Sequence, residues 1–102
     1  MYKTGTLQYY VYLAKTGTKD SIDIIMNDLF KKMSLAQSKF IDYALGLAET
    51  HQAKAQIEHY LFCGTQIQRN YCALYFGRLD EYTIIRQAYE RGLIDARQAF
   101  SR

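Results

Sequence analysis

The chain has 102 residues, of which 49% are hydrophobic and 23% are charged. This length and composition argue for a single globular domain over residues 1–102, and against a disordered or fibrous protein. The net charge of +3 is spread almost evenly over the two halves of the chain, so neither half is a basic arm of the kind that binds nucleic acid.

The first expected element lies at residues 7–14, between two copies of the sequence Lys-Thr-Gly-Thr. Its apolar spacing fits a helix that is capped by Thr6 and ends at Gly17, and it also fits one face of a β-strand. The helix would bury Leu7, Val11 and Ala14, and the strand would bury Leu7, Tyr9, Val11 and Leu13. No second strand is evident, and an isolated strand leaves backbone groups without partners. A helix is therefore favoured, unless two copies of the chain exchange this segment and pair it as a strand across a dimer.

Two further helices are expected before the middle of the chain. The first covers residues 21–33, and its N-cap is either Asp20 or the serine that follows it. The second covers residues 35–49 and follows a capping box formed by Ser34 and Gln37. No strong helix breaker comes after it, so the sequence leaves open whether this helix continues into the next one.

The strongest periodic signal belongs to a central helix that begins near Ile57 and is expected to end at Gly77. Its main apolar face recurs at spacings of three and four residues. The face consists of Ile57, Tyr60, Leu61, Gly64, Ile67, Tyr71, Leu74 and Tyr75. Away from this face, Phe62, Arg69 and Phe76 repeat every seven residues and form a second stripe. The sequence therefore predicts a long helix with contacts on two sides, either at the centre of the fold or at a subunit interface.

The last quarter of the chain is expected to form two helices separated by a turn. Asp80 is the predicted N-cap of the first, and Gly92 ends it in the left-handed conformation that glycine tolerates. Asp95 and Gln98 form a capping box for a short terminal helix. This order over residues 81–102 resembles a helix-turn-helix DNA-binding segment, although Gln98 stands where that motif places an apolar residue.

Together these elements predict an all-α fold, a small bundle of three to five helices around the long central helix. No run of about 20 apolar residues is present, so no membrane span is expected. Cys63 and Cys72 are too far apart on one helix to form a disulfide, and both are expected to be buried. Without a disulfide framework or a secretory leader, a cytoplasmic location is expected.

No residue pattern indicates catalysis or a bound cofactor. His59 and Cys63 stand four residues apart and could contact one metal ion, but two ligands do not make a site. His51 lies too far along the chain to complete the set. Glycine-rich phosphate loops of the Walker type are absent from the sequence. We therefore expect no enzymatic activity, no cofactor and no metal.

The expected function is that of a non-catalytic adaptor or regulator, which forms helix-to-helix contacts with a protein partner and assembles as a homodimer. Ten tyrosines and no tryptophan supply apolar surface with polar tips, which suits half-hydrated interfaces. The residues expected at the interface are Tyr9, Tyr12, Phe62, Arg69 and Phe76. The alternative is a small nucleic-acid-binding regulator that uses the helix-turn-helix-like segment. Its contacts would be Arg86, Arg91, Arg97 and Arg102.

Overall fold

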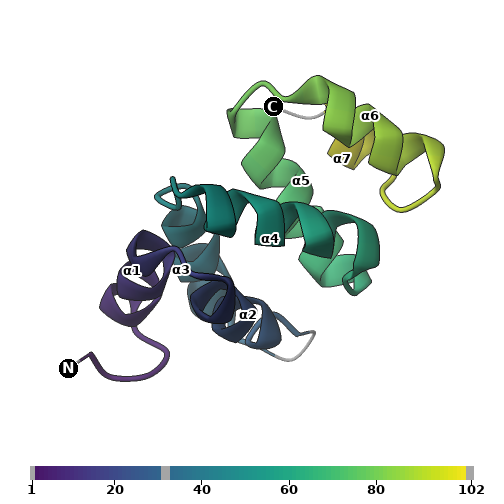
Figure 1. Ribbon diagram of the computed structural model, residues 1–102. Coiled ribbons are helices and arrows are strands. Elements are labelled where there is room, and N and C mark those ends of the chain that lie inside the picture. The colour runs from purple at the N-terminus through teal and green to yellow at the C-terminus, as the bar shows by residue number, and fades with distance from the viewer. Residues whose placement is uncertain (1, 31–32, 101–102) are drawn as a thin grey trace. The chain divides into compact units, whose positions relative to one another are not determined.

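The computed structural model describes residues 2–30 and 33–100, and all the regular secondary structure in these residues is α-helical (Figure 1). The helices are α1 (Leu7–Thr16), α2 (Lys19–Asn27), α3 (Leu35–Leu45), α4 (His51–Cys63), α5 (Gln66–Arg78), α6 (Tyr82–Glu90) and α7 (Ala96–Phe100). The predicted all-α class is confirmed. Within these described residues seven short helices replace the expected three to five, and none of them is long and apolar enough to cross a membrane.

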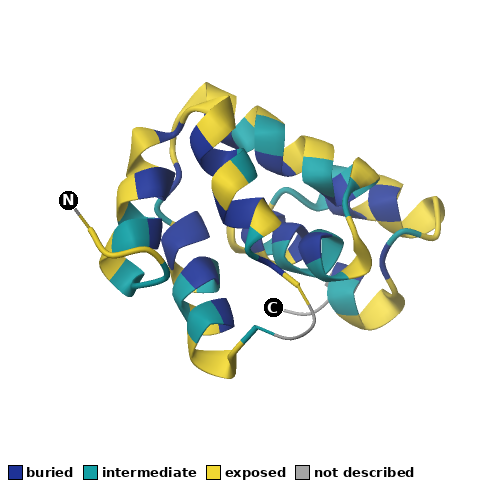
Figure 2. Cartoon of the chain, turned by 90° about the horizontal axis from the view of Figure 1, so that it is seen from below, coloured by how far each residue is buried: buried dark blue, intermediate teal, exposed yellow. Residues whose placement is uncertain are grey.

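The chain divides into two compact units, an N-terminal unit of residues 1–57 and a C-terminal unit of residues 58–102. Helix α4 contributes its first half to one unit and its second half to the other. In both units the helices bury one stripe of side chains and expose the opposite one, which Figure 2 shows as dark blue and yellow bands. The single domain inferred from length stays a prediction.

In the N-terminal unit, α1 packs against both α2 and α3. The first segment is a helix as favoured, and it begins after Thr6 and ends at Gly17 as predicted. The two Lys-Thr-Gly-Thr sequences share a physical role: in each, the glycine has a positive φ and the following threonine is the N-cap of the next helix. The φ angles are 86° at Gly5 and 65° at Gly17. The motif therefore ends one stretch of chain and starts a helix, because glycine adopts this conformation without steric cost.

Two boundaries in this unit differ from the prediction. The N-cap of α2 is Thr18, not Asp20 or Ser21. The Thr18 hydroxyl accepts a hydrogen bond from the backbone N–H of Ser21 at 3.1 Å. In return, the Ser21 hydroxyl accepts from the backbone N–H of Thr18 at 3.0 Å, which completes a capping box. Helix α2 also ends at Asn27, well short of residue 33, and residues 31–32 lie outside the described part of the chain.

The helix predicted over residues 35–49 begins where expected and stops early. The Ser34 hydroxyl accepts from the Gln37 N–H at 3.1 Å, which confirms this side of the capping box. Helix α3 ends at Leu45 and does not continue into α4. A new helix starts instead because the Thr50 hydroxyl accepts from the N–H of Ala53 at 3.0 Å and donates to the carbonyl of Gly17.

The long central helix is a wrong prediction, since a turn at Gly64 separates α4 from α5. Thr65 caps α5 through a capping box: its hydroxyl accepts from the Gln68 N–H at 3.3 Å, and the Gln68 amide oxygen accepts from the Thr65 N–H at 2.8 Å. A Cβ on Gly64 would lie 2.6 Å from the carbonyl oxygen of Tyr60, so only glycine fits this turn. The apolar periodicity continues across the turn, which is why it does not reveal the break.

In the C-terminal unit α5, α6 and α7 pack on one another, and two similar turns connect them. Helix α5 continues past Gly77, its predicted end, to Arg78. Asp80 is not the predicted N-cap of α6. It is the left-handed residue of a Schellman turn after α5, with a φ angle of 57°. The second turn confirms the prediction at Gly92, where the Leu93 N–H donates to the carbonyl of Ala88 at 3.0 Å. The predicted capping box of α7 is also present, with bonds of 2.9 Å and 3.1 Å between Asp95 and Gln98.

Candidate functional site

The most distinctive surface of the N-terminal unit is an aromatic groove beside α1. The side chains of Tyr2, Tyr12 and Tyr43 are 52%, 55% and 60% exposed, which is unusual for such large rings. With aliphatic side chains at their base they surround a hollow of about 610 Å³. We define the aromatic groove by six of its lining residues, Tyr2, Leu7, Val11, Tyr12, Tyr43 and Leu47.

A tight turn at Lys3–Thr6 brings Tyr2 to this surface. Both the backbone N–H and the hydroxyl of Thr6 donate to the carbonyl of Lys3, at 3.2 Å and 2.7 Å. The turn requires the positive φ of Gly5, and it directs the chain before it back along α1. As a result the Tyr2 ring lies against the Tyr12 ring, with 5.6 Å between their centroids and 43° between their planes. The first Lys-Thr-Gly-Thr sequence thus serves both to start α1 and to place an aromatic side chain on it.

A second hollow, of about 720 Å³, opens beside the groove and has three tyrosines in its lining. We call it the tyrosine pocket, and its lining consists of Tyr2, Thr4, Tyr9, Tyr12 and Leu13. Tyr2 and Tyr12 stand between the groove and the pocket, so they line both. Tyr9 and Tyr12 are three residues apart in α1, which places them on one face of the helix.

Buried Tyr10 supports α1 behind the rings of Tyr9 and Tyr12. Its ring contacts that of Tyr9 edge-on at 5.3 Å, and its hydroxyl donates to the Asp28 carboxylate at 2.8 Å. Burial and this hydrogen bond raise the pKa of Tyr10 well above that of a free tyrosine. The bond ties α1 to the C-terminal end of α2 and so holds the face that carries Tyr9 and Tyr12 in place.

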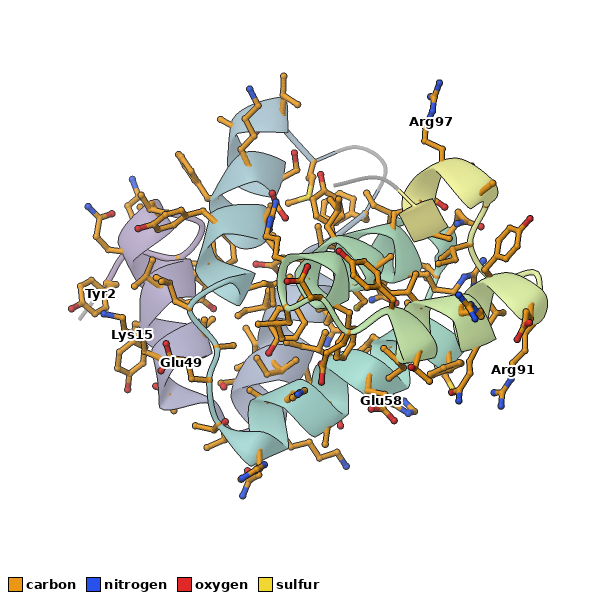
Figure 3. All side chains as sticks on the ribbon, turned by 90° about the horizontal axis from the view of Figure 1, so that it is seen from above. Tyr2, Lys15, Glu49, Glu58, Arg91 and Arg97 are labelled. Carbon is orange, nitrogen blue, oxygen red and sulfur yellow. The ribbon has the colours of Figure 1, made fainter. Side chains whose placement is uncertain are left out.

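The aromatic groove and the tyrosine pocket differ in the charge of their linings. Lys15 is the one charged residue in the lining of the groove, within the described ranges 2–30 and 33–100. Its side chain lies close to that of Tyr2, and Glu49 extends from the same side of the unit (Figure 3). The tyrosine pocket has no charged side chain among the described residues that line it. The groove thus combines apolar rings with a cation at its edge, and the pocket is uncharged.

The three predicted interface residues of the second stripe have different positions. Phe76 is fully buried, so its ring is not available to a partner. Phe62 is half-buried beneath the Arg91 guanidinium, 4.9 Å from the ring centroid. Arg69 donates from Nε to the carbonyl of Leu93 at 2.8 Å. Its terminal nitrogens donate to the Gly64 carbonyl at 2.7 Å and the Gln66 side-chain oxygen at 2.8 Å, so Arg69 has a structural position in the C-terminal unit.

The arginines of the helix-turn-helix-like segment do not form one basic surface. Arg86, Arg91 and Arg97 are exposed, and Arg102 lies outside the described residues. Arg91 and Arg97 point in different directions (Figure 3), and Arg91 is engaged with the Phe62 ring. Helix α7 is only five residues long, which is short for a helix that reads a DNA groove. The nucleic-acid contact stays a prediction, and the described geometry does not support it.

The reactive side chains are scattered. Among the described residues no group of three or more histidine, cysteine or acidic side chains could hold a metal ion. Cys72 is buried and its thiol has a raised pKa because of that burial, while Cys63 is exposed, contrary to the expectation that both are buried.

No known protein family, curated protein or solved structure significantly matches the chain.

The sequence predicted Tyr9 and Tyr12 as interface residues, and it gave no prediction for Tyr2 and Tyr43, which also line the two hollows. Tyr2 precedes every periodic segment, so no pattern placed it on α1. Tyr43 did carry a signal, because it is an aromatic residue four positions before Leu47, and residues at this spacing share a helix face. This spacing of Tyr43 and Leu47 is the sign that could have located the second wall of the groove.

Proposed function

We propose that the chain is a non-catalytic adaptor or regulator that binds protein through the aromatic groove. The observation that carries this proposal is the grouping of Tyr2, Tyr12 and Tyr43, each more than half exposed, around one hollow with a mainly apolar lining. Contiguous exposed apolar surface is typical of protein interaction sites, and tyrosine is enriched among the residues that dominate binding energy. Compared with the sequence-based proposal, which combined the tyrosine-rich segment with the second stripe, the site keeps Tyr12 and leaves out the stripe.

The partner that we propose first is a second copy of the chain. A two-fold symmetric interface needs a surface that is complementary to itself, and the groove offers both a hollow and protruding rings that could fill one. Lys15 and Glu49 lie on the same side of the unit and form no ion pair within the described residues. Across a two-fold axis the lysine of one copy could face the glutamate of the other. We also propose that the chain is located in the cytoplasm, a reducing compartment with which the exposed free thiol of Cys63 is compatible.

Sedimentation velocity over a wide concentration range tests this proposal. Tyr43→Glu should weaken self-association about 10- to 100-fold, because it places a charge at the centre of an apolar contact. Tyr89→Glu is the matched control, since Tyr89 is an exposed ring of α6 in the C-terminal unit. A wild-type chain that stays monomeric throughout, or an equal effect of the two changes, would contradict the proposed dimer.

Fluorescence anisotropy with labelled DNA and RNA at two salt concentrations tests the alternative. The dispersed arginines lead us to expect no strong binding at low salt. Tight, salt-sensitive binding that Arg97→Ala weakens would instead favour a nucleic-acid-binding regulator.

A further inference from the structure

We propose that the tyrosine pocket binds a quaternary ammonium group, such as the trimethylated side chain of a lysine on a protein partner. This inference deepens the proposed function. It rests on that function in one respect, namely that the ammonium group belongs to a protein partner. The pocket is a neighbour of the aromatic groove and is distinguished from it by Tyr9, Thr4 and Leu13.

The aromatic lining provides the attraction. An aromatic face carries a partial negative charge, and a cation within about 6 Å of a ring centroid is attracted to it. Tyr2, Tyr9 and Tyr12 supply three such rings around one hollow, and Tyr2 and Tyr12 are inclined to each other by 43° rather than stacked flat. Because these rings line the same hollow, a compact cation in it can lie within reach of more than one of them.

The charge distribution selects for a cation of this type. No charged side chain of the described residues lines the pocket, so no resident lysine or arginine fills it and no carboxylate forms a salt bridge there. Lys15 lines only the neighbouring groove. Without a carboxylate the pocket compensates poorly for the lost hydration of a primary ammonium, whereas a quaternary ammonium is weakly hydrated and binds to rings without hydrogen bonds.

The turn before α1 positions one wall of the pocket. Tyr2 reaches Tyr12 only because Gly5 holds φ at 86° and allows Lys3–Thr6 to close. A Cβ at Gly5 would be strained by this angle and would lie 3.0 Å from the amide nitrogen of the Gln37 side chain. Gly5 is therefore a positioning residue, and Gly5→Ala should weaken ammonium binding while all three rings remain in the chain.

The test is an NMR titration of the full chain with N-acetyl-trimethyllysine amide, with choline, and with a neutral analogue in which a carbon replaces the quaternary nitrogen. We expect shifts of the Tyr2, Tyr9 and Tyr12 ring signals with both cations, and at least about 5-fold weaker binding of the neutral analogue. Tighter binding of the lysine derivative than of choline would assign the ammonium to a protein, and the reverse order would assign it to a small molecule.

Substitutions separate this inference from the proposed function. Tyr9→Leu should weaken cation binding about 3- to 30-fold and leave self-association unchanged, while Tyr9→Phe should bind as the wild type because it keeps the ring. Tyr43→Leu, which alters only the groove, should leave cation binding unchanged. Equal affinity for the cationic and neutral probes, no binding of either cation, or equal losses from Tyr9→Leu and Tyr43→Leu would each overturn the inference.

Discussion

Replacing Arg69 by alanine should destabilise the C-terminal unit by about 2–3 kcal/mol. The guanidinium donates hydrogen bonds to the carbonyls of Gly64 and Leu93 and to the Gln66 side chain, so it joins the turn before α5 to the turn before α7. A hydrogen bond to a charged group contributes about 1.5–3 kcal/mol net. The Gln66 bond is exposed and adds little, so the two bonds to carbonyls supply most of the stabilisation, about 3–6 kcal/mol. Ordering the side chain costs about 2 kcal/mol, which leaves about 1–4 kcal/mol, with the stated value in the middle of that range. Arg69→Lys keeps the charge but not the planar fork, so it should lose about half of this stability.

Urea unfolding followed by circular dichroism, with amide hydrogen exchange over residues 64–94, measures the effect where it should occur. The matched control is Arg86→Ala, which removes an exposed arginine from the same unit and should change stability by less than about 0.5 kcal/mol. Equal destabilisation by the two substitutions, or unchanged exchange at the two turns, would refute the structural role of Arg69. Loss of partner binding by a fully stable Arg69→Ala chain would restore Arg69 to the interface.

Two other predictions concern stability. Asp80→Gly should stabilise the chain by about 0.5–1 kcal/mol, because Asp80 holds φ at 57°, a left-handed angle that glycine adopts without steric cost. Asp80→Ala should destabilise the chain for the same reason. Chemical denaturation measures both changes, and effects of the same sign would contradict the prediction. Stability should also fall as pH rises above about 10, because the unfolded chain then loses the Tyr10 proton while the folded chain, in which the pKa is raised, keeps it. Urea unfolding between about pH 8 and 11 measures this decline in the free energy of unfolding. Tyr10→Phe should flatten the decline, and the control Tyr43→Phe, at an exposed ring, should not. An unchanged pH dependence in both variants would contradict the attribution of the decline to Tyr10.

The candidate site was only partly predictable, because its residues meet through a turn and through helix packing. Tyr9 and Tyr12 share a helix face that the sequence itself specifies. Tyr2 joins them only once the Lys3–Thr6 turn has formed, and Tyr43 only once α3 has packed on α1. The seven-residue spacing of Phe62, Arg69 and Phe76 predicted a shared stripe, but the break at Gly64 places Phe62 on a different helix from the other two.

The sequence by itself determined the features that depend on neighbours three or four residues apart. Thr6 and Ser34 as caps, Gly17 and Gly92 as helix ends and the Asp95–Gln98 capping box were all predictable, because a cap satisfies backbone groups within its own turn. Periodicity likewise assigned the chain to the all-α class. Only the tertiary structure decided which apolar residues are covered. The Arg69 bond to Leu93 spans 24 residues, and the burial of Phe76 depends on what packs against it, so neither can be derived from local spacing.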